Sequence, residues 1–229
     1  MNESSDLPFV LAMTGASGSI YGLRLLQYLM EINQPVDLLV SRGAKTVMAE
    51  EMGLSFGDDM VAGMLNYLSL PSDSPVKLHR VENYGASVAS GSYRTRGMGI
   101  VPCRLGPLGA VAAGLTDSLI HRAATVTLKE RRPLLILVRE MPFGQIQLKN
   151  MLTLSEAGAI VCCASPGFYH KPQSVSDMVD FVVGRVLDQF GFDHSLFKRW
   201  KEDARPLKIM QEQIKLAQEP ASKISEQQN

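Results

Sequence analysis

Short apolar runs of strand length recur along this chain, and each is followed by a segment with helical periodicity. The runs lie at residues 9–13, 36–40, 98–103, 134–138 and 159–163. They are nearly continuous, which is typical of strands covered on both faces. Amphipathic segments such as 20–32 and 145–157 lie between them. This order of elements predicts an α/β fold with a Rossmann-like, doubly wound parallel sheet.

The chain of 229 residues is long enough for one such domain, whereas two domains would each be small. Residues 53–92 are less regular, with a turn cluster at 71–75 and a short expected strand at 76–81, and we interpret them as an excursion within the domain. From residue 201 onward Lys, Glu and Gln dominate. We therefore expect one domain over 1–200 and a frayed or helical tail over 201–229.

Composition excludes several classes of partner. Lys and Arg together number 23, as do Asp and Glu, so no global basic field indicates nucleic acid. The three cysteines, which include Cys162 and Cys163, have no C-x-x-C spacing, so we expect no metal site and reduced, buried thiols in a cytoplasmic protein. Residues 1–6 are polar and acidic, unlike a signal peptide, and no apolar run reaches the roughly 18 residues that span a bilayer.

The first apolar run ends in a turn of small residues, Thr14-Gly-Ala-Ser-Gly-Ser19, that opens a helical segment. Backbone amides at a helix N-terminus attract an anion, and small side chains let it approach closely. The turn differs from the G-x-G-x-x-G dinucleotide fingerprint and lacks the lysine of a P-loop. It favours a mononucleotide phosphate or a flavin, with a tight turn that binds no ligand as the alternative.

Hydroxyl-bearing and basic residues flank other runs. Ser41 follows the second run, where it either contacts a ligand or only caps a helix. Another small, hydroxyl-rich turn, Ala89-Ser-Gly-Ser-Tyr93, precedes the fourth strand, and Arg104 follows that strand where a cofactor phosphate would lie. Three such turns beside successive strands favour a ligand over coincidence.

The run at 134–138 has charge on both sides. A basic cluster that begins at Lys129 precedes it, and Arg139 and Glu140 follow it. Ligands of parallel α/β sheets bind beyond the carboxyl ends of the strands, where Arg139 would donate two hydrogen bonds to a phosphate or carboxylate. The alternative is a structural Arg139–Glu140 ion pair. Tyr169, after the last run, and Arg185, in the helix that follows, would each alone be read as packing or surface residues.

Together these motifs resemble those of the UbiX family of flavin prenyltransferases. The matching segments, in order over residues 7–200, are 14–18, 89–92, 128–133, 138–140 and 167–170 with Pro172-Gln173. The resemblance implies a flavodoxin-type, Rossmann-like fold, bound FMN, and dodecamers whose sites are built from neighbouring subunits. It also implies that the dimethylallyl group of dimethylallyl monophosphate is joined to N5 and C6 of reduced FMN. The prenylated FMN would serve a UbiD-type decarboxylase in ubiquinone biosynthesis.

The resemblance also implies roles for individual residues. Those at the FMN are Gly15, Ala16, Ser17, Ser41 and Arg139. Those at the dimethylallyl phosphate are Lys129, Tyr169 and Arg185. Those near the reacting atoms are the carboxylates of Glu51 and Glu140 and the hydroxyls of Ser17 and Ser90. The chain lacks an Asp-rich magnesium motif, which favours a monophosphate donor and a metal-independent reaction.

One segment departs from the family pattern. After Cys103 the family usually has hydroxyl residues, whereas this chain continues with Arg104-Leu105-Gly106-Pro107. Our hypothesis is that Arg104 pairs with the FMN phosphate and that the amides of Leu105 and Gly106 still donate to it.

Three other functions stay open. A flavin-dependent decarboxylase of the phosphopantothenoylcysteine type places a histidine at the flavin early in the chain, whereas the first histidine here is His79. The altered loop after Cys103 makes a flavin-binding subunit without catalysis conceivable. Direct decarboxylation of a prenylated hydroxybenzoate would need a tunnel for a long tail, which no sequence feature indicates.

Overall fold

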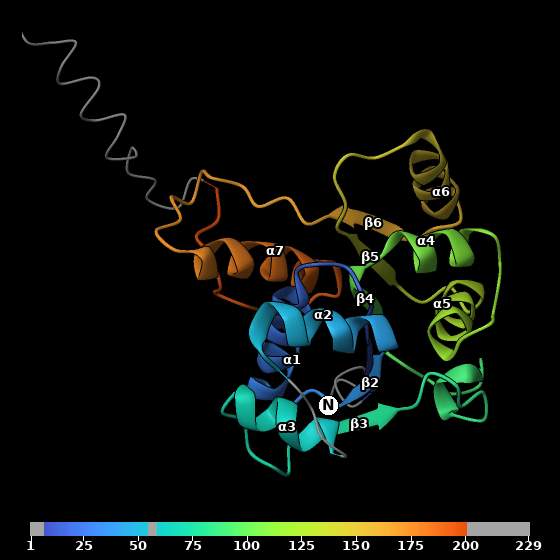
Figure 1. The fold of residues 1–229 in the computed structure, drawn as a ribbon, viewed down its shortest axis with the longest axis horizontal. Coiled ribbons are helices and arrows are strands. Elements are labelled where there is room, and N and C mark those ends of the chain that lie inside the picture. The colour runs from blue at the N-terminus through green and yellow to red at the C-terminus, as the bar shows by residue number, and fades with distance from the viewer. Residues whose placement is uncertain (1–6, 55–58, 201–229) are drawn as a thin grey trace, which may run out of the picture.

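A computed structural model describes residues 7–54 and 59–200, which contain a six-stranded parallel sheet (Figure 1). The strands are β1 Phe9–Met13, β2 Val36–Val40, β3 Val76–His79, β4 Gly97–Cys103, β5 Leu134–Val138 and β6 Ile160–Cys163. Their order across the sheet is β3-β2-β1-β4-β5-β6, the order of Rossmann folds. The prediction of a doubly wound parallel sheet is confirmed.

Helices cover both faces of this sheet (Figure 1). One face packs against α1 Ser19–Glu31, α2 Arg42–Met52, α3 Met60–Tyr67 and α7 Val175–Gln189. The other packs against α4 Leu105–Ala112, α5 Leu119–Lys129, α6 Gln145–Glu156 and the short 3-10 helix η1 Ser87–Ala89. Side chains alternate between the faces along each strand. In β1, Phe9, Leu11 and Met13 join the first hydrophobic cluster, and Val10 and Ala12 join the second.

Close packing fixes the height of α1 against the sheet. A Cβ on Gly22 would lie 2.6 Å from Cε of Met13 and would collide with the carbonyl oxygen of Val101. Only glycine lets α1 approach β1 and β4 this closely. The N-terminus of α1 is thereby held above the carboxyl end of β1.

The last strand differs from its prediction. β6 lies at one end of the strand order, so it has a neighbouring strand on one side alone, and its residues are half-buried or exposed. Cys163 is exposed and Cys162 is half-buried, whereas Cys103 in β4 is fully covered. Burial raises the pKa of the Cys103 thiol to about 12. The prediction of buried thiols is therefore correct for Cys103 and wrong for Cys163.

Residues 53–92 are more regular than the sequence indicates. They include helix α3, whose Met60 and Met64 lie four residues apart and pack into the core from one face. Strand β3 ends at His79, two residues before its predicted end. The tail predicted at 201–229 lies outside the described residues. In the described part of the chain, no helix has the length and apolarity needed to cross a membrane.

Candidate functional site

The sheet changes its direction of winding between β1 and β4, and this switch point is where ligands of open α/β sheets bind. The side chain of Thr14 joins the two strand ends. Its Oγ1 donates to the carbonyl oxygen of Pro102 at 2.9 Å and accepts from the amide of Arg104 at 2.7 Å. The turns after β1 and β4 are therefore fixed relative to each other.

Three helix N-termini converge on this switch point. The N-cap residues are Gly18 for α1, Ser41 for α2 and Arg104 for α4. The turns after β1 and β2 touch, because a Cβ on Gly15 would lie only 2.7 Å from the carbonyl carbon of Gly43. Helix N-termini present unpaired amides and positive dipole ends, so this edge suits an anion such as a flavin phosphate.

A carboxylate already binds the N-terminus of α1. Glu51, near the end of α2, accepts from the amide of Gly18 at 2.8 Å and from that of Ser19 at 3.0 Å. Partial burial raises the pKa of Glu51, but hydrogen bonds from Ser17, Gly18 and Ser19 outweigh it and hold that pKa below its usual value. This end of α1 thus stabilises negative charge, as a phosphate site requires.

Arg139 reaches the same turn from β5. Its Nε donates to the carbonyl oxygen of Ser17 at 2.9 Å, and its charge lowers the pKa of Tyr21, which burial raises by more. Glu140 accepts from the amide of Met141 at 3.1 Å. Arg139 therefore contacts the turn after β1, and the alternative of an Arg139–Glu140 ion pair is not observed among the described contacts. Ser41 Oγ accepts from the amide of Ala44 and so caps α2.

Ser90 and Lys129 lie at the opposite edge of the sheet. The turn of Ser90 precedes β4, and Lys129 ends α5 before β5 begins, so both belong to the amino edge of parallel strands. Gly91 packs against the side chain of Lys129, which is paired with Glu130. Within one chain, the 89–93 turn therefore lies at the edge of the sheet opposite to the turns after β1 and β2.

Tyr169 and Arg185 form a third group beside α7. The ring of Tyr169 packs edge-on against Phe181 with centroids 5.6 Å apart, and Arg185 lies one turn further along the same face of α7. Arg185 Nη1 donates to Asp188 Oδ2 at 2.8 Å. Asp188, which the sequence did not mark, also accepts from Arg199 at 2.8 Å. Burial raises the pKa of Asp188, but hydrogen bonds and positive charge from Arg199 and His194 outweigh that effect and lower it.

Comparison with known proteins identifies the family. The family model described as Flavoprotein matches residues 1–187. The flavin prenyltransferase UbiX of Aquifex aeolicus (strain VF5) is 46% identical over 193 residues, which cover 83% of this chain and 97% of the relative. The chain belongs to the UbiX family of flavin prenyltransferases.

Two solved structures of UbiX proteins share the fold. AnUbiX (PadA1), solved in complex with FMN and dimethylallyl pyrophosphate, aligns with a TM-score of 0.75 and 36% identity over 86% of this chain and 98% of that one. A dodecameric, FMN-dependent UbiX-like decarboxylase from Escherichia coli O157:H7 aligns with a TM-score of 0.75 and 38% identity over 85% of this chain and 100% of that one.

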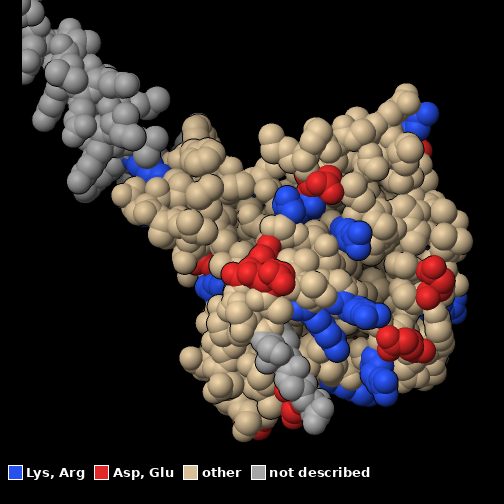
Figure 2. Space-filling model, in the orientation of Figure 1, with Lys and Arg blue, Asp and Glu red and all other residues tan. Residues whose placement is uncertain are grey.

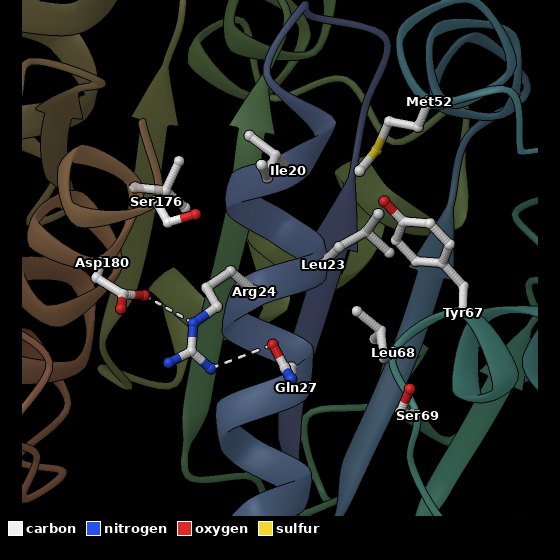
Figure 3. A pocket seen from close by; sticks show the side chains of 11 residues that line it. Ile20, Leu23, Arg24, Gln27, Met52, Tyr67, Leu68, Ser69, Ser176 and Asp180 are labelled. Carbon is white, nitrogen blue, oxygen red and sulfur yellow. Dashed lines mark hydrogen bonds and ion pairs between the residues drawn. The ribbon is translucent and has the colours of Figure 1, made fainter. Parts of the chain in front are cut away.

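A groove of about 540 Å³ lies beside the site in this UbiX protein, along α1 (Figure 3). Met52, the residue after Glu51, lines it. Among the described residues that line it, Arg24 is the one cation, and it donates to Asp180 Oδ1 at 2.7 Å. Arg24 is half-buried and its guanidinium is held by Asp180 and Gln27, so the described lining of the groove offers a phosphate no exposed cation. We therefore place the site at the strand ends and not in this groove.

Proposed function

We propose that this chain joins the dimethylallyl group of dimethylallyl monophosphate to N5 and C6 of reduced FMN. The observation that carries the proposal is the convergence of three helix N-termini on the small-residue turn after β1, in a chain of the UbiX family. The prenylated FMN would serve a UbiD-type decarboxylase in ubiquinone biosynthesis. Three free thiols support a location in the reducing cytoplasm.

The residues proposed to hold FMN all lie at the carboxyl edge of the sheet. They are Gly15, Ala16, Ser17, Ser41, Arg104, Leu105, Gly106 and Arg139. The helix N-termini would attract the phosphate, and the exposed side chain of Arg104 would add a cation. When bound in its reduced form, FMN supplies the electron-rich N5 and C6 that accept the prenyl group.

The leaving phosphate needs cations of its own. Cleavage of the allylic C–O bond places negative charge on the phosphate and positive charge on the prenyl carbons. Lys129, Arg185 and the hydroxyl of Tyr169 would stabilise the phosphate as that charge develops, without a metal ion. Lys129 and Arg185 are exposed, so both are accessible to a ligand from outside their own subunit.

Two carboxylates and two hydroxyls are assigned to the reacting atoms. Glu51 is assigned as the acceptor of the proton that C6 loses, and the hydrogen bonds that lower its pKa would have to be released for it to gain strength as a base. Ser17 hydrogen-bonds to Glu51 and would orient it. Glu140 would orient the cations around the phosphate, and Ser90 would approach the prenyl group.

The proposed site draws on more than one subunit. Lys129 precedes β5 and Arg139 follows it, and the five residues of this strand alone span roughly 13 Å. The exposed Ile146, Leu148 and Leu152 give α6 an uncovered apolar surface, and the area over α4 and α6 carries few charges in Figure 2. These features support a homo-dodecamer in which one chain's amino edge completes another chain's site.

The test combines this protein with reduced FMN and dimethylallyl monophosphate under anaerobic conditions. We expect the flavin mass to rise by one C5H8 unit while an equal amount of inorganic phosphate appears. A parallel reaction with the pyrophosphate ester separates the two donors, and transfer of the product to a flavin-free UbiD-type decarboxylase tests its use. Tight FMN binding with an unchanged flavin mass would instead indicate a subunit without catalysis.

A further inference from the structure

Arg132 holds the serine loop, residues 89–93, at the amino edge of the sheet. Its Nη2 donates to the carbonyl oxygen of Gly91 and its Nη1 to that of Tyr93, both at 2.7 Å. A planar guanidinium with donors in a fixed fork matches two carbonyls at once, which the ammonium group of lysine cannot do in the same geometry. Arg132 therefore sets both the position and the orientation of this backbone.

Further contacts hold the two ends of the serine loop. Arg122 Nε donates to the carbonyl oxygen of Ala89 at 3.0 Å. The hydroxyl of Tyr93 donates to Asp37 Oδ2 at 2.9 Å, and Oδ1 of that carboxylate lies 2.6 Å from Nε2 of the buried His79. The loop conformation is thus fixed by the protein before any ligand binds, which is the condition for positioning a reactive group.

In the serine loop, the side chain of Ser90 faces solvent and Gly91 packs against Lys129. Ser90 is exposed, and its Oγ lies 2.9 Å from that of Ser92. A Cβ on Gly91 would collide with the side chains of Lys129 and Glu130, so the loop and these side chains are in direct contact. The Ser90 hydroxyl and the Lys129 ammonium group therefore belong to one packed block.

We propose that Arg132 is a positioning residue for prenyl transfer. It fixes the Ser90 hydroxyl relative to the Lys129 ammonium group, so that one subunit offers both groups to the leaving phosphate and the prenyl chain in a single arrangement. This inference rests on the proposed function. Arg132 acts through the loop, because its donors are used by the carbonyls of Gly91 and Tyr93.

The experiment compares Arg132→Met with Arg131→Met in the full-length protein. Methionine keeps the length of the side chain and removes its donors, and Arg131 is exposed and outside the proposed site. For Arg132→Met we expect kcat to fall by about 10–100-fold, while the affinity for FMN at the other edge of the sheet stays the same. The kcat of Arg131→Met should equal that of the parent protein. The kcat of Arg132→Lys should lie between those of the parent protein and Arg132→Met.

Amide hydrogen exchange in the serine loop gives a readout that does not depend on activity. We expect faster exchange over 89–93 in Arg132→Met and unchanged exchange in β1 and β2. Unchanged kcat, or losses of kcat, FMN affinity and thermal stability together, would overturn the positioning role. A parent protein that never prenylates FMN refutes the proposed function, and this inference with it. An active parent with an active Arg132→Met variant refutes the inference alone.

Discussion

Glu51 joins two parts of the molecule through one carboxylate. It links the end of α2 to the first amides of α1, and it lies beside the turn assigned to FMN. Negative charge at a helix N-terminus is stabilising, and the same hydrogen bonds keep Glu51 ionised. The hydrogen bonds that let Glu51 stabilise the fold therefore also weaken it as a base, so its structural role and its proposed role as a proton acceptor oppose each other.

Replacing Glu51 by Gln should make stability less dependent on pH. The pKa of Glu51 in the fold lies below its usual 4.5, so its stabilisation is fully present above that pH and is lost as pH falls through the folded-state pKa. We expect Glu51→Gln to lower the free energy of unfolding at pH 7 by about 0.5–1 kcal/mol, since the group is mostly exposed. Urea unfolding of both proteins from pH 3 to 7 measures this.

The difference should shrink as pH falls below the usual pKa of 4.5, because the parent carboxylate then begins to take up a proton. Glu50→Gln is the matched control, because Glu50 is the exposed neighbour on the same helix. A constant difference at every pH would show that Glu51 stabilises through packing and not through its charge.

Sequence reasoning at this scale succeeded where a motif and its strand lie together. Arg139 lies at the end of its strand, as expected, and so does the small-residue turn that follows β1. The turn of Ser90 was correctly placed before the fourth strand, and the direction of that strand puts it at the opposite edge from the turns after β1 and β2. Arg132 was missed, because its carbonyl partners lie 39 and 41 residues away and only the fold brings them together.

Among the elements, α4 carries the departure from the family pattern. Arg104 caps this helix without a side-chain cap bond, and a Cβ on Gly106 would meet no atom within 4 Å. Nothing in the packing of the chain itself requires glycine at this position. Open space at a helix N-terminus beside the switch point suits a phosphate.

Substitutions in the first turn of α4 should separate ligand binding from folding. Arg104→Ala removes the proposed cation, and we expect FMN to bind about tenfold more weakly, or about 1.4 kcal/mol. Gly106→Ala should also weaken FMN binding while the helix is kept or slightly stabilised. Flavin fluorescence titration and thermal unfolding measure the two effects. Undiminished FMN affinity in Arg104→Ala would defeat the phosphate role of Arg104.

The elements themselves were predictable where periodicity was strong. The apolar runs gave the strands, but burial of β6 depends on its place at the end of the strand order, which its sequence does not show. Helix α3 was missed because it is short, at eight residues, and lies between turn signals. Its two core methionines were the available signal.

At the scale of the whole molecule, the sheet separates the proposed site residues into groups that one chain cannot bring together. Ser90 and Lys129 lie at the amino edge, whereas Glu51 and Arg139 lie at the carboxyl edge. We therefore propose that the reaction belongs to the assembly and not to the subunit. From the sequence, a site shared between subunits was implied only by the family resemblance. The separation of Lys129 from Arg139 became clear once the direction of β5 in the sheet was known.

Mixed assemblies should test this division directly. We expect the Lys129→Ala and Arg139→Ala proteins to be nearly inactive when each is produced alone. In oligomers assembled at random from both variants, about a quarter of the sites should be active, because such a site draws each intact residue from a different chain. Prenylated FMN formed by co-expressed, doubly tagged oligomers measures the gain. The matched control mixes Lys129→Ala with Ser90→Ala, which share one edge and should not complement. Equal inactivity of both mixtures would contradict shared sites.

The length of β5 also has a genetic consequence. A chain with a defect at one edge of its sheet would be expected to fold, join the proposed oligomer and place its damaged edge against a neighbour's intact one. Under the proposed sharing of sites, such a chain would leave the number of working sites equal to the number of normal chains, because its intact edge still completes a neighbour's site. A chain damaged at both edges would instead act as a dominant inhibitor. Under the proposed arrangement, the five residues of β5 would thus make each subunit's catalytic output depend on the quality of its neighbours.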